Sequence, residues 1–359
     1  MGLDQADDLR AVRRPDDLTT TDYEAEARGL LPAHATAYFA AAAGTGANLA
    51  EGTADWAAIR FRPRVLRDLR LVDCGTTVLG TPVSAPILVA PMAQQLAAHV
   101  DGERAMARAV AGLNSLLGVS TNSAVPFADI SATGAPWWFQ VYVTRNRSLT
   151  ELLVQRAVQH GARALMLTVD MMALLPPDVN PRNWPEGPGK ARMTNLTPAE
   201  LAAAGTGVEM DFNVSYDDIA WLRDLSGLPV LVKGVLRGDD ARACMDSGAA
   251  GIVVSTHGGR RLGPSTSSAR ALPEIVEAVG DSGEVYVDSG LRNGEHVAAA
   301  LALGARGVFV GRPALWALSA RGDAGVTGAL TALTTELRQV MLQLGAPTVA
   351  DLTPDLVVQ

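Results

Sequence analysis

The chain has 359 residues, of which 48% are hydrophobic, so it can bury a core large enough for two ordinary domains or for one barrel with additions. A formal net charge of -8, with no block of consecutive Lys or Arg, argues against a nucleic-acid partner. No apolar run reaches the roughly 18 residues of a membrane span, and the polar N-terminus has no signal-peptide pattern. We therefore expect a cytoplasmic protein without a membrane partner.

Eight short apolar segments recur along the chain, separated by alanine-rich stretches with helical spacing. This alternation indicates buried parallel strands joined by helices. A doubly wound sheet is the competing fold, but it explains neither the number of segments nor the polar residues that end each of them. We therefore predict a TIM (β/α)8 barrel over residues 86–330. The predicted strands are 86–91, 116–122, 137–143, 164–170, 229–234, 251–256, 284–290 and 307–313.

We treat residues 1–359 as a single domain with three additions to the barrel. Residues 1–60 are predicted to form an N-terminal helical segment, and the stretch RFRPRVLRDLRLVDCGTTVLG that follows suggests a short hairpin closing the barrel floor. Residues 171–213 are rich in Pro, Gly and Asn and too long for an ordinary connection after the fourth strand, so they predict a lid or binding loop. Residues 331–359 are predicted to form C-terminal helices.

Polar side chains gather at the predicted carboxyl ends of the strands, where barrels of this class place their chemistry. The sequence therefore predicts an active site on this rim. The residues are Ser120, Gln140, Tyr142, Thr168, Asp170, Lys233, His257, Asp288, Arg292 and Arg312.

The last two units of the barrel carry the signal of a phosphate site. DSGLRNGEH and GRPALWAL place Gly290 and Gly311 in turns that expose backbone N–H groups, and Arg292 and Arg312 can add bidentate donors. Lys233 ends an apolar strand and needs an anionic partner, such as a reduced flavin, a Schiff-base carbonyl or a substrate phosphate. We expect a phosphorylated cofactor.

No metal site is expected. The two cysteines, Cys74 and Cys244, lack the spacing of a zinc or disulfide framework and are predicted to be reduced core thiols. The histidines outside the STHGGRRL motif have no second ligand at a suitable spacing. These are His34, His99, His160 and His296.

The chain resembles, over nearly its full length, the FMN-dependent 2-hydroxy acid oxidases and dehydrogenases, which include glycolate oxidase, lactate oxidase and mandelate dehydrogenase. STHGGRRL is similar to the active-site signature of that family, S-N-H-G-[AG]-R-Q-L-D. The other matching segments are DYEAEARGLLPAHATAYF, WFQVYV, LPVLVKG, GAAGIVVS, VDSGLRNGEHV and ALALGARGVFVGRP.

The resemblance implies that FMN is the cofactor. The PMA turn matches the family turn beside flavin N5, Lys233 matches the lysine near N1 and O2, and Arg292 and Arg312 match phosphate contacts. The residues implied to bind the cofactor are Pro91, Met92, Ala93, Ser120, Gln140, Thr168, Lys233, Ser255, Asp288, Ser289, Gly290, Arg292, Gly311 and Arg312.

The resemblance also implies the catalytic roles. His257 matches the active-site base, Asp170 the carboxylate that orients it, and Arg260 an arginine that binds the substrate carboxylate. Tyr38 and Tyr142 match tyrosines that hydrogen-bond the substrate, beside Lys233. The implied reaction is oxidation of a 2-hydroxy acid to a 2-oxo acid, with two electrons passing through FMN to oxygen or a soluble acceptor. By the same resemblance we expect a homotetramer.

The match breaks at four positions. The second carboxylate-binding arginine of the family falls on Pro177, and a family tryptophan is replaced by Asn122, which we count among the substrate-binding candidates. The signature Gln and Asp are Arg261 and Gly263. An arginine–carboxylate contact is worth roughly 1.5–3 kcal/mol, so its loss matters for substrate choice. Arg261 either approaches the pocket and compensates, or faces solvent.

Three hypotheses follow from these departures. In the first, a 2-hydroxy acid is oxidised while Arg260, with Arg261 or Arg182, holds its carboxylate. In the second, the pocket takes a substrate without a free carboxylate there, such as an ester, an amide or a larger biosynthetic intermediate. In the third, the protein binds FMN without turnover, or is an aldolase-like barrel that uses Lys233.

Overall fold

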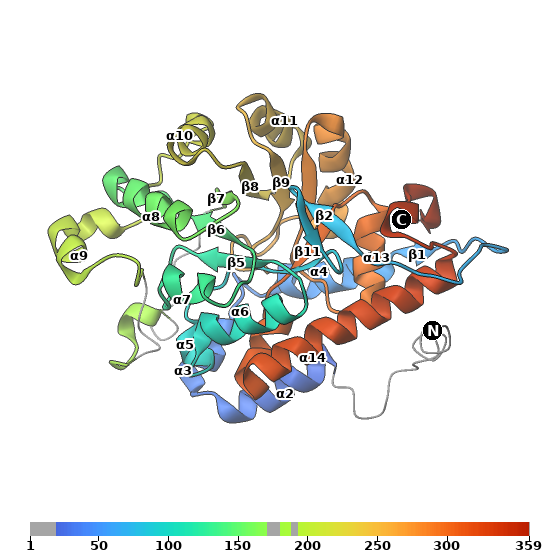
Figure 1. The fold of residues 1–359 in the computed structure, drawn as a ribbon, viewed down its shortest axis with the longest axis horizontal. Coiled ribbons are helices and arrows are strands. Elements are labelled where there is room, and N and C mark those ends of the chain that lie inside the picture. The colour runs from blue at the N-terminus through green and yellow to red at the C-terminus, as the bar shows by residue number, and fades with distance from the viewer. Residues whose placement is uncertain (1–18, 171–179, 188–192, 359) are drawn as a thin grey trace.

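The computed structural model describes residues 19–170, 180–187 and 193–358 (Figure 1). Eight parallel strands close into a barrel in the order β10-β11-β4-β5-β6-β7-β8-β9, with β9 pairing back to β10. Each predicted strand segment overlaps one of them, so the predicted TIM barrel is confirmed. The strands are β4 Ile87–Val89, β5 Leu117–Ser120, β6 Trp137–Val141, β7 Leu165–Thr168, β8 Val230–Val235, β9 Gly251–Val254, β10 Glu284–Val287 and β11 Gly307–Val310.

The strands are mostly apolar because both of their faces are buried. One set of side chains fills the barrel interior, where the Trp138 ring lies 5.4 Å from Tyr286 and 5.8 Å from Phe309, measured between ring centroids. The alternate side chains pack against the surrounding helices. These helices are α6 Gly102–Gly112, α7 Phe127–Ser131, α8 Arg147–Gln159, α10 Asp217–Ser226, α11 Gly238–Asp246, α12 Ser268–Val279 and α13 Gly294–Ala302, with a short α5 at Gln95–Ala98.

Polar caps fix where several barrel helices begin. The side chain of Asn146 accepts a hydrogen bond from the Ser148 N–H at the start of α8, and Asn293 accepts one from the His296 N–H at the start of α13. Such caps set the helix starts, and with them the lengths of the loops that follow the strand ends.

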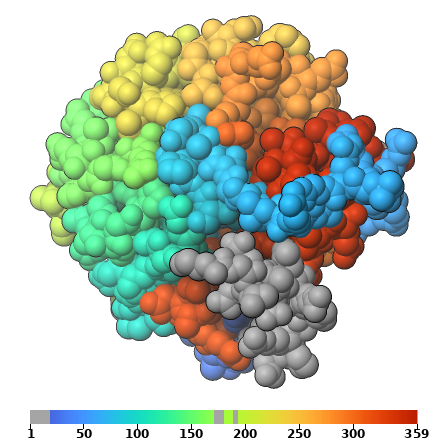
Figure 2. Space-filling view, turned by 45° about the vertical axis from the view of Figure 1, so that its right-hand side comes forward, coloured from blue at the N-terminus to red at the C-terminus, as the bar shows by residue number. Residues whose placement is uncertain are grey.

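A hairpin closes the floor of the barrel, as the sequence predicts. Strands β2 Thr76–Val78 and β3 Thr81–Val83 pair antiparallel, and Val78 and Val83 are buried with the side chains of the barrel interior. In Figure 1 the hairpin lies across one end of the barrel. In Figure 2 the light-blue chain around residues 60–85 crosses the visible face between the barrel units and the red C-terminal helix. The opposite end of the barrel is thus left for the site.

The segment before the barrel is helical where it is described. It contains α2 Thr20–Leu30, α3 Ala33–Ala40 and α4 Ala47–Ala58, while residues 1–18 lie outside the described ranges. Helix α2 starts with a capping box, in which Thr19 and Asp22 satisfy each other's backbone N–H groups. It runs along the C-terminal helix α14 (Figure 1).

The chain ends in one long helix followed by short elements. Helix α14, Arg312–Leu344, has non-helical backbone at Arg321 and Gly322, and it ends at Gly345 in the left-handed conformation. Of the predicted helical segment 331–359, the residues up to Leu344 belong to α14. The remainder forms 3-10 turns at Val349–Asp351 and Pro354–Leu356 and strand β12 Val357–Val358, which pairs antiparallel with β1 Arg60–Phe61.

The predicted lid segment 171–213 is described only in part, because residues 171–179 and 188–192 lie outside the described ranges. The described part holds 3-10 turns at Pro181–Asn183 and Gly205–Val208 and helix α9 Pro198–Ala204. Its role as a lid stays a prediction.

No helix in the described ranges is long and apolar enough to cross a membrane. Cys74 and Cys244 are buried free thiols, as predicted.

The interior aromatic cluster gives a test of the fold. Trp138→Ala should lower the free energy of unfolding by about 3–5 kcal/mol, because Trp138 is fully buried and its loss leaves a cavity in the barrel. Phe212→Ala, at a position that is 69% exposed, is the matched control and should change it by less than about 0.5 kcal/mol. Equilibrium denaturation measures both values, and equal losses would contradict the described interior.

Candidate active site

A cleft opens at the carboxyl ends of the barrel strands, with an empty volume of about 1050 Å³ including the solvent at its mouth. This size suits a cofactor together with a small substrate. It brings together most of the predicted site residues, from every part of the chain. Those that line it are Tyr38, Pro91, Met92, Ala93, Ser120, Asn122, Gln140, Tyr142, Thr168, Lys233, His257, Arg260, Asp288, Ser289, Gly290, Arg292, Gly311 and Arg312.

Three predicted site residues are not among those lining the cleft. Asp170 and Ser255 lie directly behind it, in contact with lining residues. Arg182 is elsewhere: its side chain is 50% exposed and its guanidinium lies 3.5 Å from the Glu209 carboxylate. The structure therefore does not bring Arg182 to the site. Pro177 lies outside the described residues.

A row of polar side chains ends the neighbouring strands β5, β6 and β7. The Gln140 amide accepts a hydrogen bond from the Ser120 hydroxyl at 3.2 Å and donates one to the Thr168 hydroxyl at 3.0 Å. All three side chains are buried, so their mutual bonds fix the orientation of the amide. The row presents a rigid polar edge to the cleft.

Lys233 is held at the end of β8 by a buried ion pair. Its Nζ lies 2.9 Å from the Asp288 carboxylate and donates to the Ser255 hydroxyl at 2.9 Å. The side chains of Lys233 and Asp288 are only 4% and 8% exposed. The Asp288 carboxylate also accepts hydrogen bonds from Ser255 and Ser289, each at 2.6 Å. Breaking such a pair is costly, so Lys233 is fixed as a cation that borders the cleft.

Backbone carbonyls, rather than acids, hold Arg312 at the far end of the cleft. Its guanidinium donates to the carbonyls of Phe39 at 3.0 Å, Gly258 at 2.7 Å and Ala41 at 2.7 Å. Arg292 donates to the carbonyl of Leu291 at 2.8 Å. These bonds fix the two guanidinium groups and leave their positive charge uncompensated.

Three arginines of the cleft thus need an anion. Within the described ranges, no ion pair joins Arg260, Arg292 or Arg312 to a carboxylate at 4.0 Å or less. Burial lowers the pKa of Arg312 to about 9, with the charges of Arg260 and Arg292 acting in the same direction. Burial also lowers the pKa of Arg292. A bound anion would relieve this penalty, and the N-terminus of α14 at Arg312 favours negative charge at the same place.

His257 follows β9 with a left-handed backbone, φ 56°, and its Nδ1 lies 3.2 Å from both Asp170 carboxylate oxygens. Its backbone N–H donates to the Ser255 hydroxyl at 2.9 Å. Burial lowers the pKa of His257 to about 4; the Asp170 charge opposes this shift, and the charges of Lys233 and Arg261 add to it. The imidazole is therefore neutral near pH 7 and able to accept a proton.

Asp170 stays ionised beside this base. Burial acts to raise the pKa of its carboxyl, but the interactions with His257, including a hydrogen bond, and the charges of Lys233 and Arg261 outweigh burial and hold the pKa below its usual range. An ionised Asp170 can accept a hydrogen bond from the Nδ1–H of His257, which leaves the other ring nitrogen free to act as a base.

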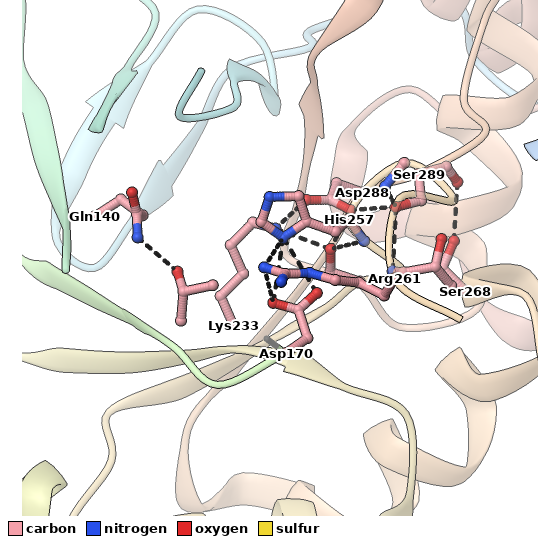
Figure 3. Close-up of polar contacts among 12 residues, drawn as sticks. Gln140, Asp170, Lys233, His257, Arg261, Ser268, Asp288 and Ser289 are labelled. Carbon is pink, nitrogen blue, oxygen red and sulfur yellow. Dashed lines mark hydrogen bonds and ion pairs between the residues drawn. The ribbon is translucent and has the colours of Figure 1, made fainter. Parts of the chain in front are cut away.

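Arg261 turns into the site rather than to solvent, and its side chain is 8% exposed. Its Nη2 lies 2.9 Å from His257 Nδ1 and 3.3 Å from an Asp170 oxygen. The same Nη2 donates to the Tyr142 hydroxyl at 3.3 Å. Figure 3 shows the guanidinium beside the imidazole and the carboxylate, joined to both by dashed lines. Of the two placements left open by the sequence, the structure has the inward one.

The predicted substrate-binding side chains other than Arg182 line the same cleft as His257. The Arg260 guanidinium lies over the Tyr38 ring, 4.8 Å from its centroid, and donates to the Tyr38 carbonyl at 2.6 Å. Trp184, from the segment predicted as a lid, packs edge-on against Tyr38 at 5.3 Å between ring centroids. Burial raises the pKa of Tyr142 to about 12, so its hydroxyl is a donor at neutral pH.

Gly234 has a role that sequence reasoning missed. It has a φ of 109°, and a Cβ placed there would lie 2.4 Å from Asp170 Cγ. Only a glycine lets the β8 backbone pass this close to the carboxylate. The glycine directly after the strand-end Lys233 was the available signal.

The loop at Ser289 is also held by side chains that the sequence does not reveal. The Trp56 indole N–H and the Ser268 hydroxyl both donate to the Ser289 carbonyl, at 3.0 Å and 2.9 Å. Trp56 lies 233 positions away in the chain, so no local pattern predicts this contact.

In the described ranges, no group of three or more His, Cys, Asp or Glu side chains is placed to hold a metal ion.

Comparisons with known proteins identify the family of this chain. Residues 27–359 match the family model described as FMN-dependent dehydrogenase. L-lactate oxidase of Nostoc sp. is 38% identical over 360 residues, covering 96% of this chain and 98% of the relative. Glycolate oxidase 1 of Zea mays is 39% identical over 345 residues, covering 92% and 93%. A solved structure of a mandelate oxidase variant with (S)-mandelic acid has a TM-score of 0.86 at 34% identity, covering 95% of this chain and 97% of that one.

The Gly234 contact gives a test of the site geometry. Gly234→Ala should push the Asp170 carboxylate away from His257 and lower the free energy of unfolding by about 1–3 kcal/mol more than Gly227→Ala does. Gly227 is the matched control because its φ is also positive, 67°, but a Cβ added there would meet nothing within 4 Å. Denaturation and a crystal structure of each variant measure the effect, and an unmoved Asp170 would contradict it.

Proposed function

Because the chain belongs to the FMN-dependent dehydrogenase family, we propose that it oxidises a 2-hydroxy acid to a 2-oxo acid, with His257 as the base. The observation that carries this proposal is a neutral, partly buried imidazole held against the ionised Asp170 at a cleft whose arginines have no ion-pair partner among the described residues. A protein that only binds a cofactor has no need of an oriented base at this place.

The residues of the cleft fit FMN. Arg292 and Arg312 would hold its phosphate, together with the N–H groups at the start of α14. The polar row of Ser120, Gln140 and Thr168 would contact the flavin ring, and Lys233 would lie near its pyrimidine side. When bound, FMN supplies a two-electron acceptor to the reaction.

The side chains around His257 would have separate roles toward the substrate. Arg260 would bind the carboxylate, and the Tyr38 and Tyr142 hydroxyls would donate to substrate oxygens. The His257 nitrogen opposite Nδ1 would accept a proton from the substrate carbon or hydroxyl. The ionised Asp170 would then stabilise the imidazolium and hold the ring in place.

Charge favours an acid over a neutral substrate. Asp288 is the only carboxylate among the described residues that line the cleft, and it is paired with Lys233. The phosphate of FMN would engage Arg292 and Arg312, which leaves Arg260 for the substrate. The replacement of the second family arginine by Pro177 is the feature that favours an ester or amide instead, so neutral derivatives belong in the same test.

We further propose oxygen or a soluble carrier as the electron acceptor, because the relatives similar to this chain are named oxidases. A homotetramer in the cytoplasm remains the expected assembly. Oxygen consumption during turnover and light scattering of the purified protein test the two statements separately.

Anaerobic reduction of the FMN-loaded protein tests the function. Glycolate, L-lactate and both enantiomers of mandelate are mixed with it, alongside the methyl esters and amides of the same compounds. At least one free acid should bleach the flavin absorbance at a rate above those of its ester and amide. Bleaching by the neutral derivatives alone would shift the proposal to a substrate without a carboxylate, and no bleaching by any compound would contradict it.

His257→Gln isolates the base. The variant should bind FMN like the parent but reduce it about 100 to 10,000 times more slowly with the best acid, since a positioned base contributes that much. His160→Gln, at an exposed histidine at the end of α8, is the control and should keep the parent rate. Stopped-flow absorbance under nitrogen gives the rates, and parental reduction by His257→Gln would remove His257 from the proposal.

A further inference from the structure

Arg261 is a buried cation that the reaction proposed above does not use. Its Nε and Nη1 are buried and have no hydrogen-bond partner in the described part of the chain. Its Nη2 makes the contacts with His257, Asp170 and Tyr142 described above. Among the described residues, the only acid paired with this guanidinium is therefore the carboxylate that also holds the base.

Two charged groups, the Arg261 guanidinium and the Asp170 carboxylate, lie against the same ring nitrogen of His257. His257 Nδ1 lies 2.9 Å from Arg261 Nη2 and 3.2 Å from both Asp170 oxygens, and it can make one hydrogen bond in the plane of the ring. A protonated Nδ1 donates to Asp170. An unprotonated Nδ1 would accept from Arg261, which can only donate, but the neutral ring would then carry its proton on the opposite nitrogen, which the proposed base needs free.

Arg261 opposes the imidazolium in two ways. Its Nη2 lies 2.9 Å from His257 Nδ1, so the guanidinium charge acts directly against a positive charge on the ring. The guanidinium charge also offsets the Asp170 charge that would otherwise stabilise the imidazolium. Both effects have the same sign, and both favour the neutral ring.

We propose that Arg261 is a positioning residue that keeps His257 neutral by placing its charge beside the imidazole and sharing Asp170, while Asp170 accepts the Nδ1 proton and leaves the opposite ring nitrogen free. The proposal rests on the proposed function only in the use of His257 as a base. The other groups that face the imidazole are Lys233, paired with Asp288, and the Tyr142 hydroxyl, which is un-ionised at neutral pH. They are present in every variant below, so a difference between variants reports Arg261.

The sign of the expected pH effect follows from the charges. The pKa of His257 is lowered in the folded protein, and Arg261 contributes to the lowering after burial. Removing Arg261 should raise this pKa, so the base becomes protonated at a higher pH. The acid limb of kcat/KM, which reports the free enzyme, should then move to higher pH.

The experiment compares Arg261→Gln, Arg261→Met and Arg261→Lys with Arg237→Gln. Arg261→Gln and Arg261→Met both remove the charge but differ in side-chain shape, so one can still be measured if the other fails to fold. Arg261→Lys keeps the positive charge but lacks the planar guanidinium group. Arg237 is the control, because it is 69% exposed and pairs locally with Asp239. Circular dichroism and retained FMN establish that each variant is folded.

Two readouts are taken for each variant. The first is the pH dependence of kcat/KM with the best acid. The second is an NMR titration of the histidine rings, with the His257 signal assigned by its loss in His257→Gln. The uncharged variants should move both the acid limb and the His257 titration upward by at least about 1 pH unit, a typical effect of one nearby charge. Arg261→Lys should move them less, and Arg237→Gln should not move them.

Unchanged titration of His257 in the folded uncharged variants would overturn the proposal. So would a rise in KM with an unmoved acid limb, because that result makes Arg261 a substrate ligand. If no acid is oxidised by any form of the protein, the proposed function fails, while the NMR titration still decides whether Arg261 controls the charge of His257.

Discussion

Three arginine side chains held by backbone carbonyls rather than by acids set the chemistry of this protein. Arg260, Arg292 and Arg312 converge on one cleft, where carbonyl oxygens and, for Arg260, the Tyr38 ring contact their guanidinium groups. Burying cations in this way is unfavourable unless anions complete the site. A phosphate at the end formed by β10, β11 and the start of α14, and a carboxylate near Arg260, would satisfy this requirement together. The proposed binding of FMN and the proposed choice of an acidic substrate therefore rest on the same charges.

The base is built on the same rim but depends on charges behind the cleft. Asp170 reaches His257 because Gly234 has no side chain, and it is kept ionised by the surrounding cations. An aspartate without a neighbouring cation would raise the pKa of the imidazole. The ring would then be a stronger base, but more of it would already be protonated at neutral pH. Arg261 lies against both groups and shifts this balance toward the neutral ring. In this proposal the residue that replaces the signature glutamine of the family acts on the base, whereas the sequence leaves open a ligand for the substrate or a side chain that faces solvent.

The sequence predicts the barrel well because its strands are buried on both faces and leave continuous apolar runs, each ended by polar residues. It also predicts most of the residues that line the cleft, since strand ends of a parallel barrel meet on one rim. Other features depend on contacts between distant segments. Arg261 and Asp170 are 91 positions apart, and the Trp56 support of Ser289 spans 233 positions. The first hypothesis offers Arg182 as a ligand for the substrate carboxylate, yet its side chain is 50% exposed and pairs with Glu209. The chain after Gly345 packs as turns and a short strand because that glycine ends α14.

The need of the buried arginines for a phosphate is measured most directly by comparing FMN with riboflavin. The two flavins differ only in the phosphate group, and the decrease in flavin fluorescence on addition of apoprotein measures the dissociation constant of each. Since a charged hydrogen bond is worth roughly 1.5–3 kcal/mol, two arginines should make FMN bind at least about 100-fold more tightly than riboflavin. Equal dissociation constants for the two flavins would show that the guanidinium groups of the cleft are not neutralised by the cofactor phosphate, and would contradict the site described here.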